Sequence, residues 1–136
     1  MNRFWFVLIT AALLVSACAG SAAESNTSSG QNGDDAVAEG AELFSQGTLG
    51  GLAGCRSCHS TSTSSFGTGP ALGGIGLIAG ERVPGLTAEA YLRESIVDPN
   101  AYLVDDYTRG LMPRGYVDTL TTEEIDNLVQ YLLSLQ

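Results

Sequence analysis

Glycine is concentrated in the middle of this 136-residue chain, and it limits what that segment can become. Between Gly47 and Gly85, 11 of 39 residues are glycine, which leaves a backbone too free to form long helices or strands. The rest of the chain offers three short amphipathic helices, at 36–46, 88–97 and 122–135. A core of this size rarely stabilises a small domain without a disulfide, a metal or a cofactor. The sequence therefore predicts a bound group around which the glycine-rich segment folds.

The three predicted helices carry recognisable start signals. Asp34 or Asp35 can cap the first helix, and Thr87 can cap the second. Thr121 and Glu124 have the spacing of a capping box at the start of the third. No segment alternates apolar and polar residues cleanly enough to be a half-buried strand. We therefore predict an all-α domain with long irregular loops.

Cys55, Cys58 and His59 form the motif C-x-x-C-H, which is typical of c-type haem attachment. Two thiols three residues apart lie on one side of a helical turn, where each can add across one vinyl group of haem. The adjacent His59 can then aim a ring nitrogen at the iron. Zinc, a redox-active thiol pair and a plain disulfide remain as alternatives. Zinc normally needs a fourth ligand, a redox pair needs a βαβ context, and a disulfide leaves the only histidine unexplained. We therefore predict one covalently bound haem c.

The second axial ligand decides whether the protein fills both axial positions of the haem iron or leaves one open to small molecules. His59 is the only histidine, lysine is absent, and Met112 is the only methionine besides Met1. Met112 lies in a glycine-flanked loop, and a histidine–methionine pair is a standard haem ligand set. We predict His59 and Met112 as the axial ligands. Two alternatives are an open-site ligand sensor or peroxidase-like protein, and a structural subunit whose haem only fixes the fold.

This ordered set of features resembles the class I monohaem cytochromes c over residues 36–136. The matching features are Gly40 and Phe44, the CRSCH motif, Gly69-Pro70-Ala71-Leu72, Met112-Pro113 and Tyr131-Leu132. The resemblance implies a small fold of short helices and long loops around one haem, acting as an electron carrier and not as an enzyme. It also implies that the first and last helices cross where Gly40 faces Tyr131. The carbonyl of Pro70 would hold the proximal imidazole.

Within that family, residues 87–107 followed by Leu111-Met112-Pro113 look most like cytochrome domains of bacterial respiratory complexes. Examples are haem-copper oxidase subunits and the small lipoprotein cytochrome of alternative complex III. The resemblance implies single-electron transfer between respiratory or photosynthetic complexes, as a tethered carrier or as a subunit. Many relatives use a tryptophan to hold a haem propionate, whereas the only tryptophan here is Trp5. The available substitutes, each with an ordinary core or surface role as the alternative, are Tyr102, Tyr107, Tyr116, Arg82, Arg109 and Arg114.

The first 17 residues have the layout of a secretory signal peptide. Arg3 is the only early charge, and an apolar run follows over residues 4–15. The sequence Val15-Ser16-Ala17-Cys18 resembles the bacterial lipoprotein box, in which the chain is cut before the cysteine and its sulfur receives lipid. The alternatives are ordinary signal cleavage, which would discard Cys18 and release a soluble protein, and an uncleaved membrane span.

These signals divide the chain into three parts. We predict a signal peptide at 1–17, a lipidated cysteine and flexible linker at 18–35, and one cytochrome-like domain at 36–136. The protein would then be anchored by lipid to the cell membrane and would face the periplasm or another extracytoplasmic side.

The charge of the chain narrows the choice of partners. With 15 acidic residues, 6 arginines and no lysine, its formal net charge is −9, which argues against nucleic acid. Such a chain suits redox partner proteins, or a membrane complex, with a basic docking face. Gly74, Gly76 and Ala79 match the dinucleotide-binding pattern G-x-G-x-x-A, but no predicted strand precedes them.

Overall fold

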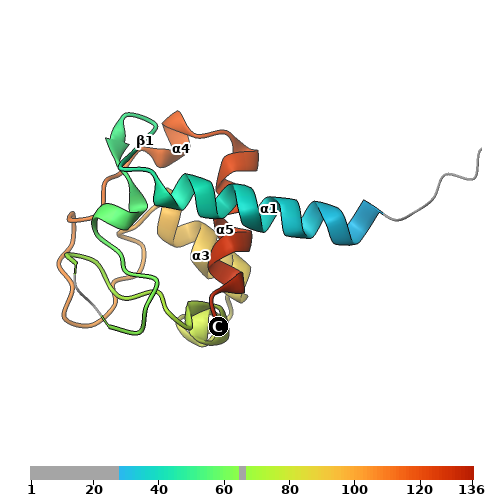
Figure 1. Cartoon of the computed structure of the whole chain (residues 1–136). Helices are drawn as coiled ribbons and strands as arrows, with labels where there is room; N and C mark the ends of the chain where they lie inside the picture. Colours follow the sequence, from blue (N-terminus) through green and yellow to red (C-terminus); the bar gives the residue numbers. More distant parts are fainter. Residues whose placement is uncertain (1–27, 65–66) are drawn as a thin grey trace, which may run out of the picture.

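The computed structural model describes residues 28–64 and 67–136. The predicted signal peptide at 1–17, Cys18 and the linker as far as residue 27 lie outside the described residues. Helices form most of the regular structure, as the all-α prediction requires (Figure 1). They are α1 (Ser28–Ser45), α2 (Ile75–Ile78), α3 (Ala88–Val97), α4 (Tyr116–Thr119) and α5 (Thr122–Ser134), with single 3₁₀ turns η1 (Cys55–Ser57) and η2 (Ala79–Glu81).

The first and last helices cross at a glycine, as the resemblance implied. A Cβ atom on Gly40 of α1 would lie 2.0 Å from the carbonyl oxygen of Asn127 and 2.8 Å from the Cβ of Tyr131, both on α5. One turn further on, the rings of Phe44 and Tyr131 pack with their centroids 5.4 Å apart. Figure 1 shows α1 running across α5 at this point. The missing side chain of Gly40 therefore sets the distance between the two helices.

The apolar stripe of α5 forms the centre of the core. It is buried against α1 on one side and against α2 and α3 on the other. Its buried apolar members are Ile125, Leu128, Val129 and Leu132. This spacing keeps them on one face of a 3.6-residue helix, and their burial fixes the scaffold that carries the loops.

The predicted caps of α3 and α5 are present. The side chain of Thr87 accepts a hydrogen bond from the backbone N–H of Ala90 at 3.1 Å. At α5, Thr121 Oγ1 accepts from the N–H of Glu124 at 3.2 Å, and the Glu124 carboxylate accepts from the N–H of Thr121 at 2.8 Å. These bonds satisfy backbone groups that have no partner inside the helix, so both helices begin where the sequence predicted.

Besides the short helices α2 and α4, which were not predicted, two features differ from the sequence prediction. Helix α1 begins at Ser28, so residues 28–35 of the predicted flexible linker are helical, and the prediction that Asp34 or Asp35 caps this helix was wrong. Once the packed part around Gly40 is formed, extension toward the N-terminus needs no new helix nucleus, which allows even the weak helix formers of this segment to join the helix. The chain also contains one antiparallel hairpin, β1 (Thr48–Leu49) with β2 (Leu52–Ala53). Gly50 and Gly51, both with positive φ, form its two-residue turn.

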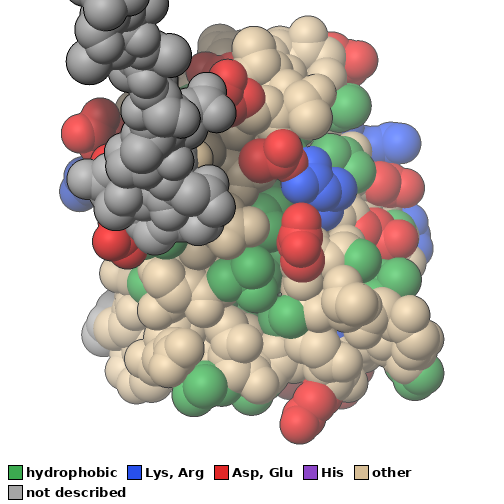
Figure 2. Space-filling view, turned by 90° about the vertical axis from the view of Figure 1, so that its right-hand side faces the viewer, with side chains coloured by type: hydrophobic (Ala, Val, Ile, Leu, Met, Phe, Trp, Pro, Cys, Tyr) green, Lys and Arg blue, Asp and Glu red, His purple; other side chains and the backbone are tan. Residues whose placement is uncertain are grey.

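Charged side chains are spread over the surface. On the face drawn in Figure 2, acidic side chains are prominent and the few basic ones lie among them. Arg93 of α3 forms an ion pair with Asp126 of α5 and lies 4.0 Å from Glu89, which links the two helices at the surface. None of the described helices is long and apolar enough to span a bilayer.

Candidate functional site

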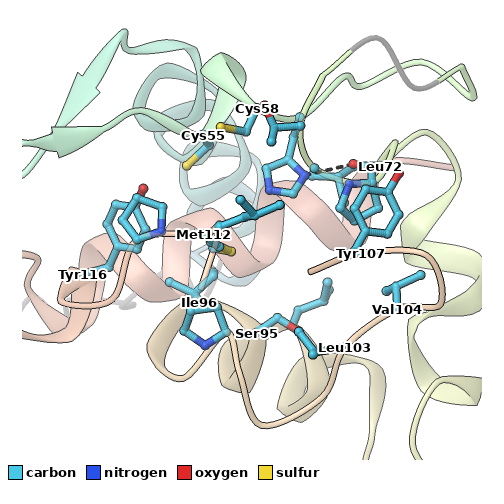
Figure 3. Close-up of a pocket in the computed structure, with 18 of the residues that line it drawn as sticks. Cys55, Cys58, Leu72, Ser95, Ile96, Leu103, Val104, Tyr107, Met112 and Tyr116 are labelled. Atoms are coloured by element: carbon cyan, nitrogen blue, oxygen red, sulfur yellow. Dashed lines mark hydrogen bonds between the residues drawn. The ribbon is translucent and has the colours of Figure 1, made fainter. Parts of the chain in front are cut away.

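A largely apolar cavity lies between the Cys55–His59 segment and the long loop that follows α3 (Figure 3). Side chains of α3 and α5 line it as well, and its empty volume, including space open to solvent, is about 1220 Å³. This is large enough for a cofactor-sized ligand. The structure brings together at this cavity five of the six site residues predicted from the sequence, namely Cys55, Cys58, His59, Pro70 and Met112. The sixth, Cys18, lies outside the described residues.

Cys55 begins the single turn η1, and Cys58 directly follows it, so the two cysteines flank the helical turn that the motif predicted. The N–H groups of Cys58 and His59 both donate to the carbonyl of Cys55, at 3.2 and 3.0 Å, which closes the turn. Both thiols are free. Burial raises the pKa of the Cys55 thiol to about 11, so this thiol is protonated at neutral pH.

The residues between the cysteines tie this turn to the end of α1. The guanidinium of Arg56 donates to the carbonyl of Ser45 at 3.2 Å, and the hydroxyl of Ser57 donates to the carbonyl of Gly47 at 3.3 Å. A cation beside the C-terminal carbonyls of a helix is favourable. These contacts hold the attachment turn against the helical scaffold.

The ring of His59 is held in a defined orientation. Its Nδ1 lies 2.9 Å from the carbonyl oxygen of Pro70, the partner that the resemblance implied. A carbonyl only accepts, so Nδ1 carries the hydrogen and Nε2 keeps a free lone pair. Burial lowers the pKa of His59, an effect that the bond to Pro70 opposes, and the ring is neutral at pH 7.

Gly69 leaves room for that imidazole. A Cβ atom at this position would lie 2.5 Å from Cε1 of His59, well inside van der Waals contact. The ring therefore packs directly on the backbone of the Gly69-Pro70 pair. A neutral histidine with one nitrogen hydrogen-bonded and the other free is the usual form of a metal ligand.

Met112 reaches the cavity from the irregular loop between α3 and α4. Its side chain is half-buried, whereas that of Leu111 beside it is 51% exposed, so the chain turns Met112 inward. In Figure 3 the thioether of Met112 lies inside the cavity together with the thiols of Cys55 and Cys58. Gly110 and Gly115 on either side have φ of 84° and 118°, a left-handed conformation that favours glycine.

The match to known proteins covers the part of the chain that builds this cavity. Residues 37–136 match the family described as Cytochrome c. The chain belongs to the cytochrome c family. It therefore carries a covalently bound haem c and serves as a haem-based electron carrier that exchanges electrons with redox partners. In a sequence comparison, no curated protein matches this cytochrome.

The cavity fits the haem that the family implies. It presents two thiols, one imidazole nitrogen and one thioether sulfur, and its remaining wall is mostly apolar. Buried Arg82 Nε has no hydrogen-bond partner among the described residues, and Arg82 lies close enough to Tyr91 to act on its pKa. A buried donor without a partner, near a residue that lines the cavity, suits an acceptor such as a haem carboxylate. Within the described residues, no three His, Cys, Asp or Glu side chains are grouped so that they could hold a metal ion.

Sequence reasoning identified some of the other lining residues and missed some. Of the six proposed substitutes for tryptophan, the three tyrosines line the cavity and the three arginines do not. Tyr91 and Asn100, which were not singled out, also line it. Tyr91 is buried at the face of α3 that carries Ser95 one turn later, so helical spacing alone could have indicated it. Asn100 lies in a loop, where no periodicity gives such a signal.

Proposed function

We propose that this cytochrome is a membrane-anchored, single-haem carrier that moves one electron at a time between respiratory or photosynthetic complexes, as a tethered carrier or as a subunit. The observation that supports the single-haem, electron-transfer part of this proposal is the cavity, which His59 and Met112 both line from separate segments. When bound, haem supplies iron that changes between the ferric and ferrous states.

The roles of the cavity residues follow from their chemistry. Cys55 and Cys58 would hold the porphyrin through their sulfurs, and His59 Nε2 and the Met112 sulfur would be the two protein ligands of its iron. An iron held by both of these side chains would offer no open site to oxygen or peroxide. The carbonyl of Pro70 keeps the imidazole in the tautomer that binds metal. A thioether ligand in an apolar cavity favours the ferrous state and raises the reduction potential.

Replacement of Met112 tests this coordination. The ferric wild-type protein should show the weak near-infrared charge-transfer band of sulfur bound to iron, and Met112→Ala should lose it. The ferrous Met112→Ala protein should also bind carbon monoxide at least about tenfold more tightly, because no ligand has to be displaced. Leu77→Ala, at an exposed leucine of α2 that does not line the cavity, is the control and should behave like wild type. A wild-type protein without the band, with high-spin iron, would favour the ligand sensor or the peroxidase-like alternative.

The anchor proposal rests on the sequence before the described residues. We propose that Cys18 carries lipid and holds the domain at the extracytoplasmic face of the cell membrane. The apolar run that ends in Val15-Ser16-Ala17-Cys18 supports this. Detergent, and not high salt, should release the wild-type protein from membranes, while Cys18→Ser should lose that detergent-dependent association. Wild-type protein found in the soluble fraction would instead indicate ordinary signal cleavage.

A further inference from the structure

The loop that carries Met112 has little backbone support. It runs from the end of α3 to the start of α4, and much of it lines the cavity. Across the described residues, no backbone–backbone hydrogen bond joins residues 108–114 to the rest of the chain. An irregular segment without such bonds keeps its conformational freedom unless side chains restrain it. Side-chain contacts must therefore hold Met112 in place.

Asn100 provides such contacts from the opposite end of the loop. Its side-chain Oδ1 accepts a hydrogen bond from the N–H of Gly110 at 2.9 Å. Its backbone carbonyl accepts one from Nη1 of Arg109 at 3.0 Å. Pro99, directly before it, is buried, and α3 ends at Val97, so Asn100 is attached to the rigid part of the fold. One residue thus closes the loop across ten positions.

The bond to Gly110 acts close to the thioether. Met112 follows Gly110 by two residues, so their Cα atoms are at most about 7 Å apart. Gly110 has a left-handed φ of 84°, and its N–H is the group that Asn100 binds. A change at this bond therefore alters the path of the backbone directly before Met112.

We propose that Asn100 is a positioning residue for Met112. Its side-chain oxygen fixes the Gly110 end of the loop, and this keeps the Met112 sulfur at the iron. The inference rests on the proposed axial pair of His59 and Met112. Loss of the bond leaves Met112 free to dissociate more often, so a competing ligand reaches the iron more easily.

Titration of the ferric holoprotein with imidazole tests this role, because imidazole has to displace Met112 before it can bind the iron. Asn100→Ala removes the acceptor and should increase the imidazole affinity about tenfold, the effect of one lost hydrogen bond. Asn100→Asp keeps an oxygen in the same place and should stay within about threefold of wild type. Asn100→Ser shortens the side chain, retains its turn propensity, and should reproduce the increase if the alanine variant does not fold.

Thr87→Ala is the matched control, because it also removes one side-chain oxygen that accepts from a backbone N–H. It should lower the thermal midpoint and leave the imidazole affinity unchanged. Unchanged affinity in both Asn100→Ala and Asn100→Ser, or an equal increase in Thr87→Ala, would overturn the positioning role.

The variant Met112→Ala distinguishes failure of the positioning role of Asn100 from failure of the proposed axial pair. If it binds imidazole no more tightly than wild type, the axial pair fails and the role of Asn100 fails with it. If it binds more tightly while the Asn100 variants match wild type, only Asn100 is excluded.

Discussion

Two glycines decide how closely other groups approach one another in this cytochrome. At Gly69 the imidazole of His59 packs on the backbone, and a Cβ would lie 2.5 Å from its ring. At Gly40 the backbone of α5 occupies the place of the side chain. Neither glycine has a positive φ, so each is needed for space and not for backbone conformation. Because Gly69 has no side chain, the imidazole of His59 can lie against the backbone. Because Gly40 has none, α1 and α5 can cross closely.

Gly40→Ala tests the crossing of the two helices. The new Cβ would lie 2.0 Å from the carbonyl oxygen of Asn127, so α1 and α5 would have to move apart. We expect the free energy of unfolding to fall by about 1–3 kcal/mol, the usual cost of overpacking a tight contact. A denaturant titration of the holoprotein measures this difference.

Gly33→Ala in the same helix is the control for that substitution. No atom lies within 4 Å of the place where its Cβ would be. Alanine is the better helix former at such an exposed site, and we expect a gain of about 0.5–1 kcal/mol. A Gly40→Ala protein as stable as wild type would contradict the close crossing.

At the scale of elements, local signals predicted the helices that begin with a side-chain cap. Helix α3 has the predicted bounds, Ala88–Val97, and α5 begins directly after Thr121. Both depend on bonds between residues three positions apart, which a sequence displays directly. The Cys55–His59 turn could be predicted equally well, because haem attachment requires a fixed local spacing of the two cysteines and the histidine.

The elements that depend on distant contacts were not predicted. Helix α2 lies in the glycine-rich segment and is held by the end of α5, where the N–H of Gly76 donates to the carbonyl of Leu135 at 2.9 Å. Helix α4 is held through Tyr116, whose hydroxyl donates to the carbonyl of Ala53 in the hairpin. Such partners are far away in the sequence, so no local sequence pattern indicates these contacts. The bond from Asn100 to Gly110 belongs to the same class.

At the scale of the whole molecule, the inside and the surface carry different parts of the function. The cavity holds the electron-carrying group among apolar side chains, while the surface carries a formal net charge of −9. Long-range attraction between opposite charges steers weak redox encounters without lengthening them. We therefore propose that the partners of this cytochrome present a basic face, and that salt weakens their encounter.

Two small redox reagents of opposite charge test the sign of this field without any choice of partner protein. The reduced protein is mixed with ferricyanide, an anion, or with a cationic cobalt phenanthroline complex, and its oxidation is followed optically. Between about 10 mM and 200 mM salt, the rate with the anion should rise and the rate with the cation should fall, because salt screens repulsion and attraction alike. The field near the cavity decides the outcome, since both reagents react there. Rates that change in the same direction, or not at all, would mean that the negative net charge produces no corresponding field at the site of electron exchange. The proposal of a basic partner face would then lose its support.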